Sequence, residues 1–285
     1  MLKLYRNIFF IVSVVLLVTS CRDNFTGTDY NSSKIVVDGS IEVGGYAHVI
    51  LTNSLSLNQK IDSSSYLHLV NTHAKITISD GTTKEILTLT KDNNVFPPHY
   101  YTTLKMKGEV GKTYWLEVIV DGDTIRSKTS IPNGISLDSI WLEPDASDTT
   151  RRFIWLKMCD NGAEKNFYRS FTRIMGKQKE FIPTYLSAFN DKLINGTCPE
   201  IVLYKGAENF TDKSTVYSYS KTDTVLLKVS TIDETSYNFW KNYEKEVFNS
   251  GNPFAGNGSN LTSNVTGGLG IWCGYNSKVY TVIVR

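Results

Sequence analysis

Two kinds of hydrophobic pattern occur along this chain. The first is a continuous apolar run from Ile8 to Val18, which follows Lys3 and Arg6 and precedes small residues and Cys21. The run is too short to cross a hydrocarbon core of about 30 Å, and its order of positive, apolar and small residues is that of a secretory signal peptide. The second pattern begins at Lys34 and alternates apolar with polar residues, which predicts β-strands.

In the first half the alternation predicts which side chains point inward. The expected inward sets are Ala47, Val49 and Leu51; Leu87 and Leu89 of a single strand over Glu85–Thr90; Tyr114, Leu116, Val118 and Val120; and Ile125, Thr129 and Ile131. Asp121-Gly122 separates the last two sets and suits a tight hairpin, because both residues adopt positive φ readily. We therefore expect residues 34–132 to form a small β-sandwich of immunoglobulin or transthyretin type.

Pro132-Asn133-Gly134 breaks the pattern and is the expected domain boundary. Residues 135–285 restart with strands and form a second β domain. The expected strands are Leu137–Leu142, Phe153–Met158, Asn166–Met175, Val225–Val229 and Val279–Val284. One amphipathic helix is expected near 235–250, with Trp240, Tyr243 and Val247 on one face, Asp233 as its N-cap and Gly251 as its C-cap. The predicted fold class is mostly β, with two sandwich-like domains.

Charge and motifs exclude several classes of function. The 30 basic and 28 acidic residues are well mixed and give a net charge of +2, which favours neither nucleic acid nor an acidic polymer as partner. The four histidines show no metal-ligand spacing, and there is no GxSxG elbow. Turn chemistry explains Asp121-Gly122-Asp123 and Asp160-Asn161-Gly162 better than calcium does. We expect no catalytic residue, no metal and no cofactor.

Val18-Thr19-Ser20-Cys21 resembles the lipobox of bacterial lipoproteins. The resemblance implies that residues 1–20 are removed and that Cys21 carries fatty acids such as palmitate. Residues 21–33 then form a polar tether. The alternative is an ordinary signal peptide with an unrelated cysteine. Asp23 weakly resembles the surface-export signals of Bacteroidetes lipoproteins.

Motifs throughout the mature chain resemble domain-of-unknown-function family 4249 of Bacteroidetes lipoproteins. They are Val36-Val37-Asp38-Gly39, Gly111-Lys112-Thr113-Tyr114, Asn166-Phe167-Tyr168-Arg169, Asp233–Gly251 running into Asn252-Pro253-Phe254, and Asn264–Trp272. The resemblance implies an outer-membrane location, with the lipid-anchored protein exposed at the cell surface. It also implies a partner among TonB-dependent receptors. It carries over no functional residue.

Two kinds of covalent modification remain open. Cys159, Cys198 and Cys273 allow three disulfide pairings with one thiol left over. Thr124, Ser139, Thr149 and Thr224 each follow an aspartate in a pattern that resembles the O-glycosylation sequon of exported Bacteroidetes proteins. Ordinary residue preferences at strand starts explain the second pattern equally well.

The functional expectation is a non-enzymatic accessory or ligand-binding component of a TonB-dependent nutrient-uptake system. Its expected receptor contacts are the polar loops Ser54–Leu69 and Gly251–Gly267. The alternatives are a surface adhesion or assembly module and a hydrolase with an unmarked site. Trp115, Trp141 and Trp155 suggest an aromatic binding platform, although core packing is the favoured interpretation for each.

Replacing Cys21 by serine tests the anchor. We expect Cys21→Ser to abolish labelling by a fatty-acid analogue and to release the protein from membranes, because the mature sequence contains no other apolar anchor. Label retained by the variant would contradict the lipidation.

Overall fold

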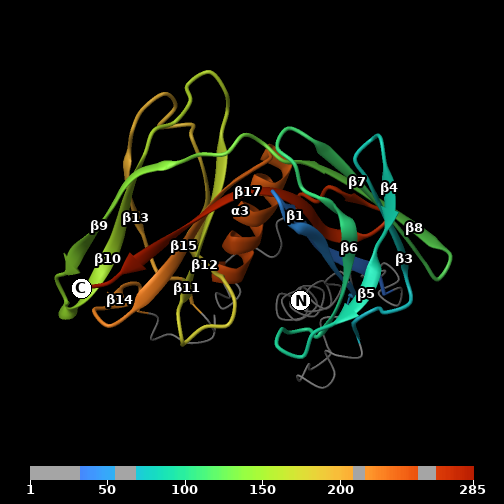
Figure 1. Ribbon diagram of the computed structural model, residues 1–285, viewed down its shortest axis with the longest axis horizontal. Helices are drawn as coiled ribbons and strands as arrows, with labels where there is room; N and C mark the ends of the chain where they lie inside the picture. The colour runs from blue at the N-terminus through green and yellow to red at the C-terminus, as the bar shows by residue number, and fades with distance from the viewer. Residues whose placement is uncertain (1–32, 55–68, 208–215, 250–260) are drawn as a thin grey trace, which may run out of the picture. The chain divides into compact units, whose positions relative to one another are not determined.

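The computed structural model describes residues 33–54, 69–207, 216–249 and 261–285, and from Lys34 onward it forms one compact unit. The signal peptide, Cys21 and most of the tether lie outside the described residues. The predicted class is confirmed: the described chain is mostly β and sandwich-like, with the single helix α3 (Glu234–Asn249) near its C-terminal end (Figure 1).

The described strands form three sheets. The eight-stranded sheet has the order β12 (Ile182–Asn190), β11 (Phe167–Ile174), β15 (Thr224–Ile232), β17 (Leu269–Ile283), β1 (Ile35–Glu42), β2 (Tyr46–Asn53), β6 (His99–Lys107), β5 (Thr88–Lys91). The five-stranded sheet has the order β16 (Val265–Thr266), β8 (Asp123–Ser130), β7 (Thr113–Val120), β3 (Lys75–Ser79), β4 (Lys84–Ile86). The four-stranded sheet has β10 (Asp148–Met158) between β9 (Leu137–Asp145) on one side and β13 (Glu200–Leu203) and β14 (Tyr219–Ser220) on the other.

The first sandwich follows the predicted alternation closely. Its core combines the inward residues of β1, β2 and β6 with those of β3, β7 and β8. The hairpin at Asp121-Gly122 is as expected, with φ of 51° and 90°. The single strand expected over Glu85–Thr90 is wrong, because the chain changes sheets there. Leu87 is buried between β4 and β5, while Leu89 is 40% exposed rather than inward.

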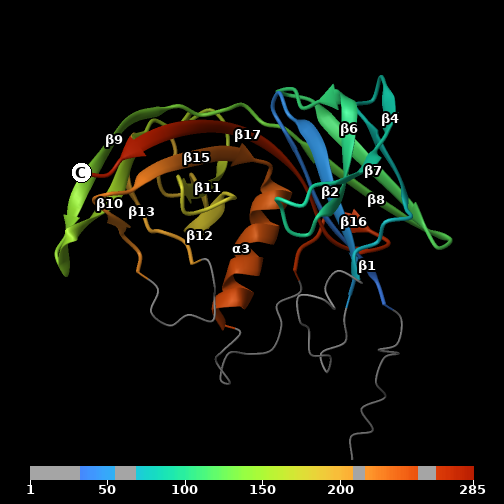
Figure 2. The ribbon, with the colours of Figure 1, turned by 60° about the horizontal axis from the view of Figure 1, so that its bottom comes forward.

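The second core lies between the four-stranded sheet and strands β11, β15 and β17. Inward residues of β10, such as Ile154 and Leu156, are fully buried there against Leu227 of β15. The other face of the large sheet packs against α3, which contacts β12, β11 and β17 (Figure 2). The large sheet is therefore covered by two smaller sheets on one face and by the helix on the other.

Strand β17 runs through both sandwiches. Its first part, Leu269 to Tyr275, pairs in parallel with β1, and its second part, Asn276 to Ile283, pairs antiparallel with β15. Trp272 fills the first core, although it lies far along the chain from the rest of that core. The expected boundary at residues 132–134 lies over the point where β17 changes partners, since the Asn276 amide donates to the Pro132 carbonyl at 2.9 Å. That boundary stays a prediction.

The predicted helix is present, and Asp233 caps it. The Asp233 carboxylate accepts the backbone N–H of Ser236 at 2.8 Å, as an N-cap residue does. Its second oxygen accepts the hydroxyl of Thr129 at 2.7 Å, which ties the helix start to β8. The buried side of the helix includes Tyr237 and Phe239, whereas Tyr243 is 41% exposed and does not belong to it. The C-cap expected at Gly251 lies outside the described residues.

Trp272→Ala tests the shared strand. The indole is fully buried, so we expect the free energy of unfolding to fall by about 3–5 kcal/mol. Denaturant unfolding measures it, with Val279→Ala as control because Val279 lies on the same strand and is 52% exposed. The control is expected to change stability by about 0.5 kcal/mol or less. Equal losses in the two variants would contradict the role of Trp272.

Candidate functional site

The outward face of the five-stranded sheet carries the described chain's most exposed tryptophan. Tyr114 and Leu116 of β7 point into the core, so Trp115 between them points out and is 45% exposed. Core packing was the favoured interpretation for Trp115, and the structure shows it to be wrong. Alternation within a strand fixes that the two neighbours face opposite ways, but it does not say whether another layer covers the outward face.

Trp115 lies in a row of side chains that crosses four strands. The register pairs Ser79 with Lys84, Ser79 with Trp115, and Trp115 with Lys128. Directly opposed residues of neighbouring antiparallel strands have side chains about 5 Å apart. The indole therefore stands between Ser79 on β3 and Lys128 on β8, with Lys84 one strand further out.

A tight turn at Asp80 to Thr83 closes one end of this site. Asp80 accepts the backbone N–H groups of Thr83 and Thr82 at 2.7 and 3.0 Å, and these bonds hold the pKa of its carboxyl well below the usual value. Gly81, with φ of 88°, donates its N–H to the Ser79 hydroxyl at 3.1 Å. A methyl group at Gly81 would lie 3.3 Å from the Trp115 ring, so the turn packs directly against the indole.

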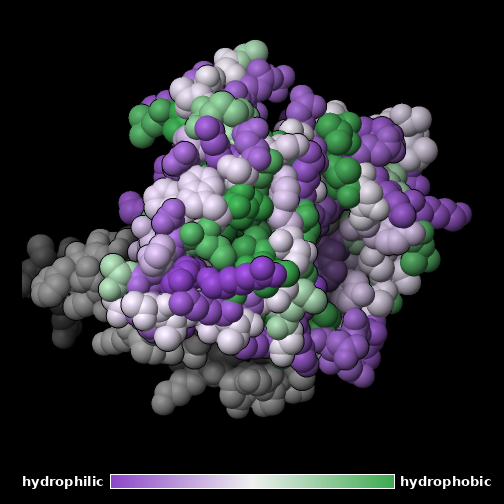
Figure 3. Space-filling model, turned by 60° about the vertical axis from the view of Figure 1, so that its left-hand side comes forward, coloured by the Kyte–Doolittle hydropathy of each residue, from purple (hydrophilic) through white to green (hydrophobic). Residues whose placement is uncertain are grey.

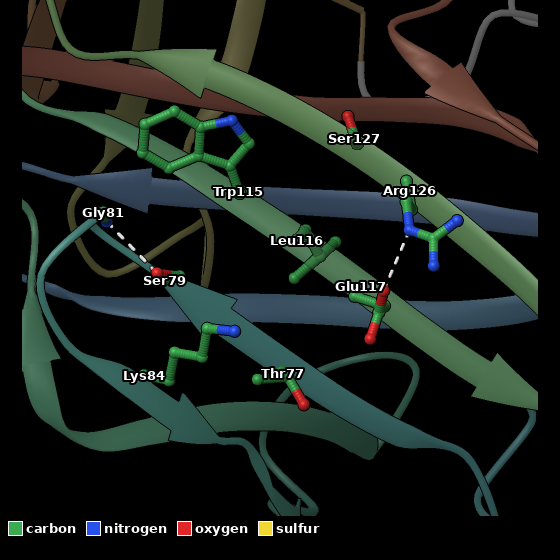
Figure 4. A pocket seen from close by; sticks show the side chains of 9 residues that line it. All are labelled: Thr77, Ser79, Gly81, Lys84, Trp115, Leu116, Glu117, Arg126 and Ser127. Carbon is green, nitrogen blue, oxygen red and sulfur yellow. Dashed lines mark hydrogen bonds and ion pairs between the residues drawn. The ribbon is translucent and has the colours of Figure 1, made fainter.

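A second row lies beside the first and contains an ion pair. Arg126 donates to Glu117 at 2.9 Å, and Thr77 is the neighbour of Glu117 on β3 (Figure 4). Residues of both rows line a cavity of about 350 Å³, and Lys128 is the member of the first row that lies outside its lining. Pockets for small molecules span roughly 300–1,000 Å³, so this cavity suits a small ligand or one unit of a longer one.

Trp141 and Trp155 also point outward, from the four-stranded sheet. They are half-buried and stack with ring centroids 6.1 Å apart, in the same outward set as Phe153 and Val202. Figure 3 shows hydrophobic residues at the centre of this side, surrounded by hydrophilic ones. An aromatic series continues from Phe153 through Tyr204, Tyr217 and Tyr185 to Phe248, with centroids 4.7 to 6.2 Å apart.

A third candidate is the set of charged groups between α3 and the large sheet. Arg169 is only 5% exposed, donates to the Tyr275 hydroxyl at 2.8 Å, and lies 3.5 Å from the centroid of the Trp240 ring. Ser187 accepts from Arg169 at 3.3 Å and donates to the Glu244 carboxylate, so it links the two charges.

Burial governs titration in this cluster. Loss of water raises the pKa of Glu244, although the Ser187 hydroxyl and the charge of Arg169 act in the opposite direction. Burial likewise lowers the pKa of Lys228, whose ammonium lies 3.7 Å from Glu42. Perturbed groups of this kind mark functional sites or structural ion networks. No described histidine contacts Ser187, so a Ser–His nucleophile is not assembled among the described residues.

The modification candidates fall into three groups. The structure pairs Cys159 with Cys198 and leaves Cys273 free and buried. Thr124, Ser139 and Thr149 are exposed and Thr224 is half-buried. Each of the four lies at or near a strand start, so glycosylation stays a prediction. Cys21 and most of the two expected receptor-contact loops lie outside the described residues.

Among the described residues, no group of three or more His, Cys, Asp or Glu side chains is arranged to hold a metal ion. None of the helices described is long and apolar enough to cross a membrane.

The family model for "Domain of unknown function (DUF4249)" matches residues 23–281, nearly the whole chain after Cys21. The chain belongs to the DUF4249 family. No curated protein matches it.

The geometry explains part of the motif by which this DUF4249 chain resembles its family. Asn264 accepts the Trp272 N–H at 3.0 Å and donates to the Trp272 carbonyl at 2.7 Å, which holds that residue in place. Gly270, with φ of 100°, would carry a Cβ only 1.9 Å from the Val37 carbonyl oxygen, so β17 reaches β1 only through glycine. The glycine that lies against the Trp272 ring is Gly39 of β1, since a methyl group at Gly39 would lie 2.8 Å from the ring.

Sequence reasoning missed the lysines that flank Trp115. Lys84 and Lys128 lie 44 positions apart, and only strand register brings them to the same row. The signal that could have found the site was the outward position of Trp115 opposite Tyr114, followed two residues later by an outward glutamate on the same strand.

The pH dependence of stability tests the buried cluster. Because the pKa of Glu244 is raised in the folded protein, ionisation of Glu244 destabilises the fold as pH rises above its usual pKa of about 4.3. We expect Glu244→Gln to gain stability relative to the parent chain as pH rises from about 4 to about 7, while exposed Glu164→Gln shows no such trend. Urea unfolding across this range measures it, and a difference independent of pH would contradict the burial of charge.

Proposed function

We propose that this DUF4249 protein is a lipid-anchored, non-enzymatic ligand-binding protein at the outer membrane, serving as an accessory component of a TonB-dependent nutrient-uptake system. The observation that carries the proposal is the exposed Trp115 in a cavity with polar and charged side chains around it. An exposed aromatic ring beside hydrogen-bonding groups is typical of ligand recognition rather than of packing.

The chemistry of the same face supports binding over catalysis. Its one outward carboxylate in these rows, Glu117, is engaged by Arg126, whereas glycoside hydrolysis ordinarily uses two carboxyl groups. The Ser79 hydroxyl donates to the Thr83 carbonyl and accepts from Gly81, and no described histidine lines the cavity to activate it.

Sequence features support the location and the partner. The lipobox-like Val18–Cys21 favours a membrane anchor, and holding the folded part near the membrane raises its effective concentration toward neighbouring receptors. A TonB-dependent receptor as partner rests on the family resemblance alone. Crosslinking in native membranes, with a lipid-anchored protein as control, tests that association.

The second candidate function is a surface adhesion or assembly module. It is favoured by the outward Trp141–Trp155 stack and the aromatic series beside it, since exposed apolar surfaces of this kind mark interaction sites. Self-association of the purified protein that is lost on Trp155→Ala would favour this function over the first.

The test of ligand binding uses the full mature protein in detergent against a panel of oligosaccharides and peptides. We expect binding that weakens about tenfold or more in Trp115→Ala, because exposed aromatic anchors dominate the affinity of such sites. Ile119→Ala is the matched control, since Ile119 lies on the outward side of the same strand and is 40% exposed. Binding that Trp115→Ala leaves unchanged would place the site elsewhere, and turnover of any panel member would overturn the non-enzymatic part.

A further inference from the structure

The face around Trp115 is locally basic, although the whole chain is nearly neutral. Three adjacent rows of outward side chains carry four cations and one anion. They are the two rows described above and the next row, in which Lys75 pairs with Ile119. The cations are Lys75, Lys84, Arg126 and Lys128, and the anion is Glu117. A surplus of one sign on one face creates a local potential that the net charge of the protein does not report.

The excess of positive charge is centred on the side chain of Trp115. Glu117 neutralises Arg126 at 2.9 Å. The nearest acidic residue on the turn, Asp80, gives one oxygen to backbone N–H groups and the other to Lys112 at 3.2 Å. Lys84 and Lys128 form no ion pair with any described residue, and they lie on opposite sides of Trp115 in its row.

Three groups of different chemistry therefore meet at the cavity. The flat indole face suits the C–H face of a pyranose ring, which is apolar, while the ring's hydroxyl groups need hydrogen-bonding neighbours. Thr77 lines the cavity and supplies such a neighbour, while the Ser79 hydroxyl, which donates its proton to the Thr83 carbonyl, has only acceptor capacity left. Lys84 also lines the cavity, whereas Lys128 lies opposite Trp115 in the same row and outside the cavity lining. Neither lysine forms an ion pair with a described residue, so a negative group on the ligand would be attracted to both, because a cation gains most from an opposite charge held at short range.

From this combination we infer that the Trp115 cavity binds a saccharide carrying negative charge, as a carboxylate or a sulfate ester on the sugar. The inference rests on the proposed function and names its ligand class. A nucleic acid strand fits less well, since such strands bind on several successive aromatic rings, and Trp115 is the only aromatic residue among the outward positions of the described strands in this sheet.

The test is isothermal titration of the full mature protein in detergent with defined probes. They are hexagalacturonate, its fully methyl-esterified form, a sulfated galactan hexasaccharide with its desulfated parent, and AMP. Methyl esterification keeps the ring and removes only the charge, so we expect it to weaken binding by about tenfold or more. The sulfated and desulfated pair shows which anionic group the site takes. AMP offers an aromatic ring and a negative charge without a pyranose.

Two variants separate ring from charge. Trp115→Ala is expected to weaken every saccharide, whereas Lys84→Gln with Lys128→Gln is expected to weaken only the anionic ones and to remove most of the salt dependence of binding. Lys75→Gln is the control, because it removes a lysine charge from the same face at a position about 13 Å from Ser79 along β3 and outside the cavity lining.

Each result of these titrations supports or overturns either the anionic class, the saccharide class or the proposed function. Tenfold preference for an anionic saccharide, lost in the double lysine variant and kept in Lys75→Gln, supports the inference. Equal binding of charged and uncharged forms, with loss in Trp115→Ala, overturns the anionic class and leaves the proposed function standing. Tighter binding of AMP than of any saccharide overturns the saccharide class. Failure of all probes overturns the inference, and the proposed function fails with it only if the wider panel also yields no ligand sensitive to Trp115→Ala.

Discussion

The change of partner along β17 is the constraint on which the rest of the structure depends. Within a single strand, the pairing switches from parallel with β1 to antiparallel with β15 between Tyr275 and Asn276. A parallel pair needs a long connection, and here nearly the whole chain forms that connection. The first sandwich is therefore complete only when the last residues of the chain have been placed against the first strand.

Several polar contacts converge where β17 switches. The Thr129 hydroxyl accepts the Gly274 N–H at 2.8 Å and donates to Asp233, which caps α3. One side chain of β8 thus fixes both the switch in β17 and the start of the helix. Arg169 reaches the same region through Tyr275. Removing one member of such a buried network leaves others unsatisfied, so we expect each substitution there to destabilise the fold.

Much of the fold was predictable from local pattern, and the failures have physical causes. The inward set of β7, the Asp121-Gly122 hairpin and the Asp233 cap depend on neighbours in sequence and were predicted correctly. The single strand over Glu85–Thr90 was wrong because Leu87 and Leu89 are chemically alike, and only tertiary pairing shows that the chain crosses between sheets at Leu87. The start of β17 was not predicted, because the glycines there allow its backbone to lie close to β1 and carry no side chains that would show an alternating pattern. Only part of the candidate site was predictable from the sequence. The outward position of Trp115 follows from alternation along its strand, whereas the positions of the flanking lysines follow from the strand register.

The burial of Cys273 has a consequence for disulfide formation while the chain folds. Beyond Cys21, an unfolded chain offers three thiols, and any two of them can be joined by oxidation. Burial raises the pKa of Cys273 to about 11 in the folded protein, so almost none of it is the thiolate that attacks disulfides. Its neighbours on β17 pack against α3, so this protection arises only after the C-terminal strand has joined the sheet. The native Cys159–Cys198 pair is then kinetically protected from exchange by completion of the fold itself, and early release of an unfinished chain would expose it to scrambling.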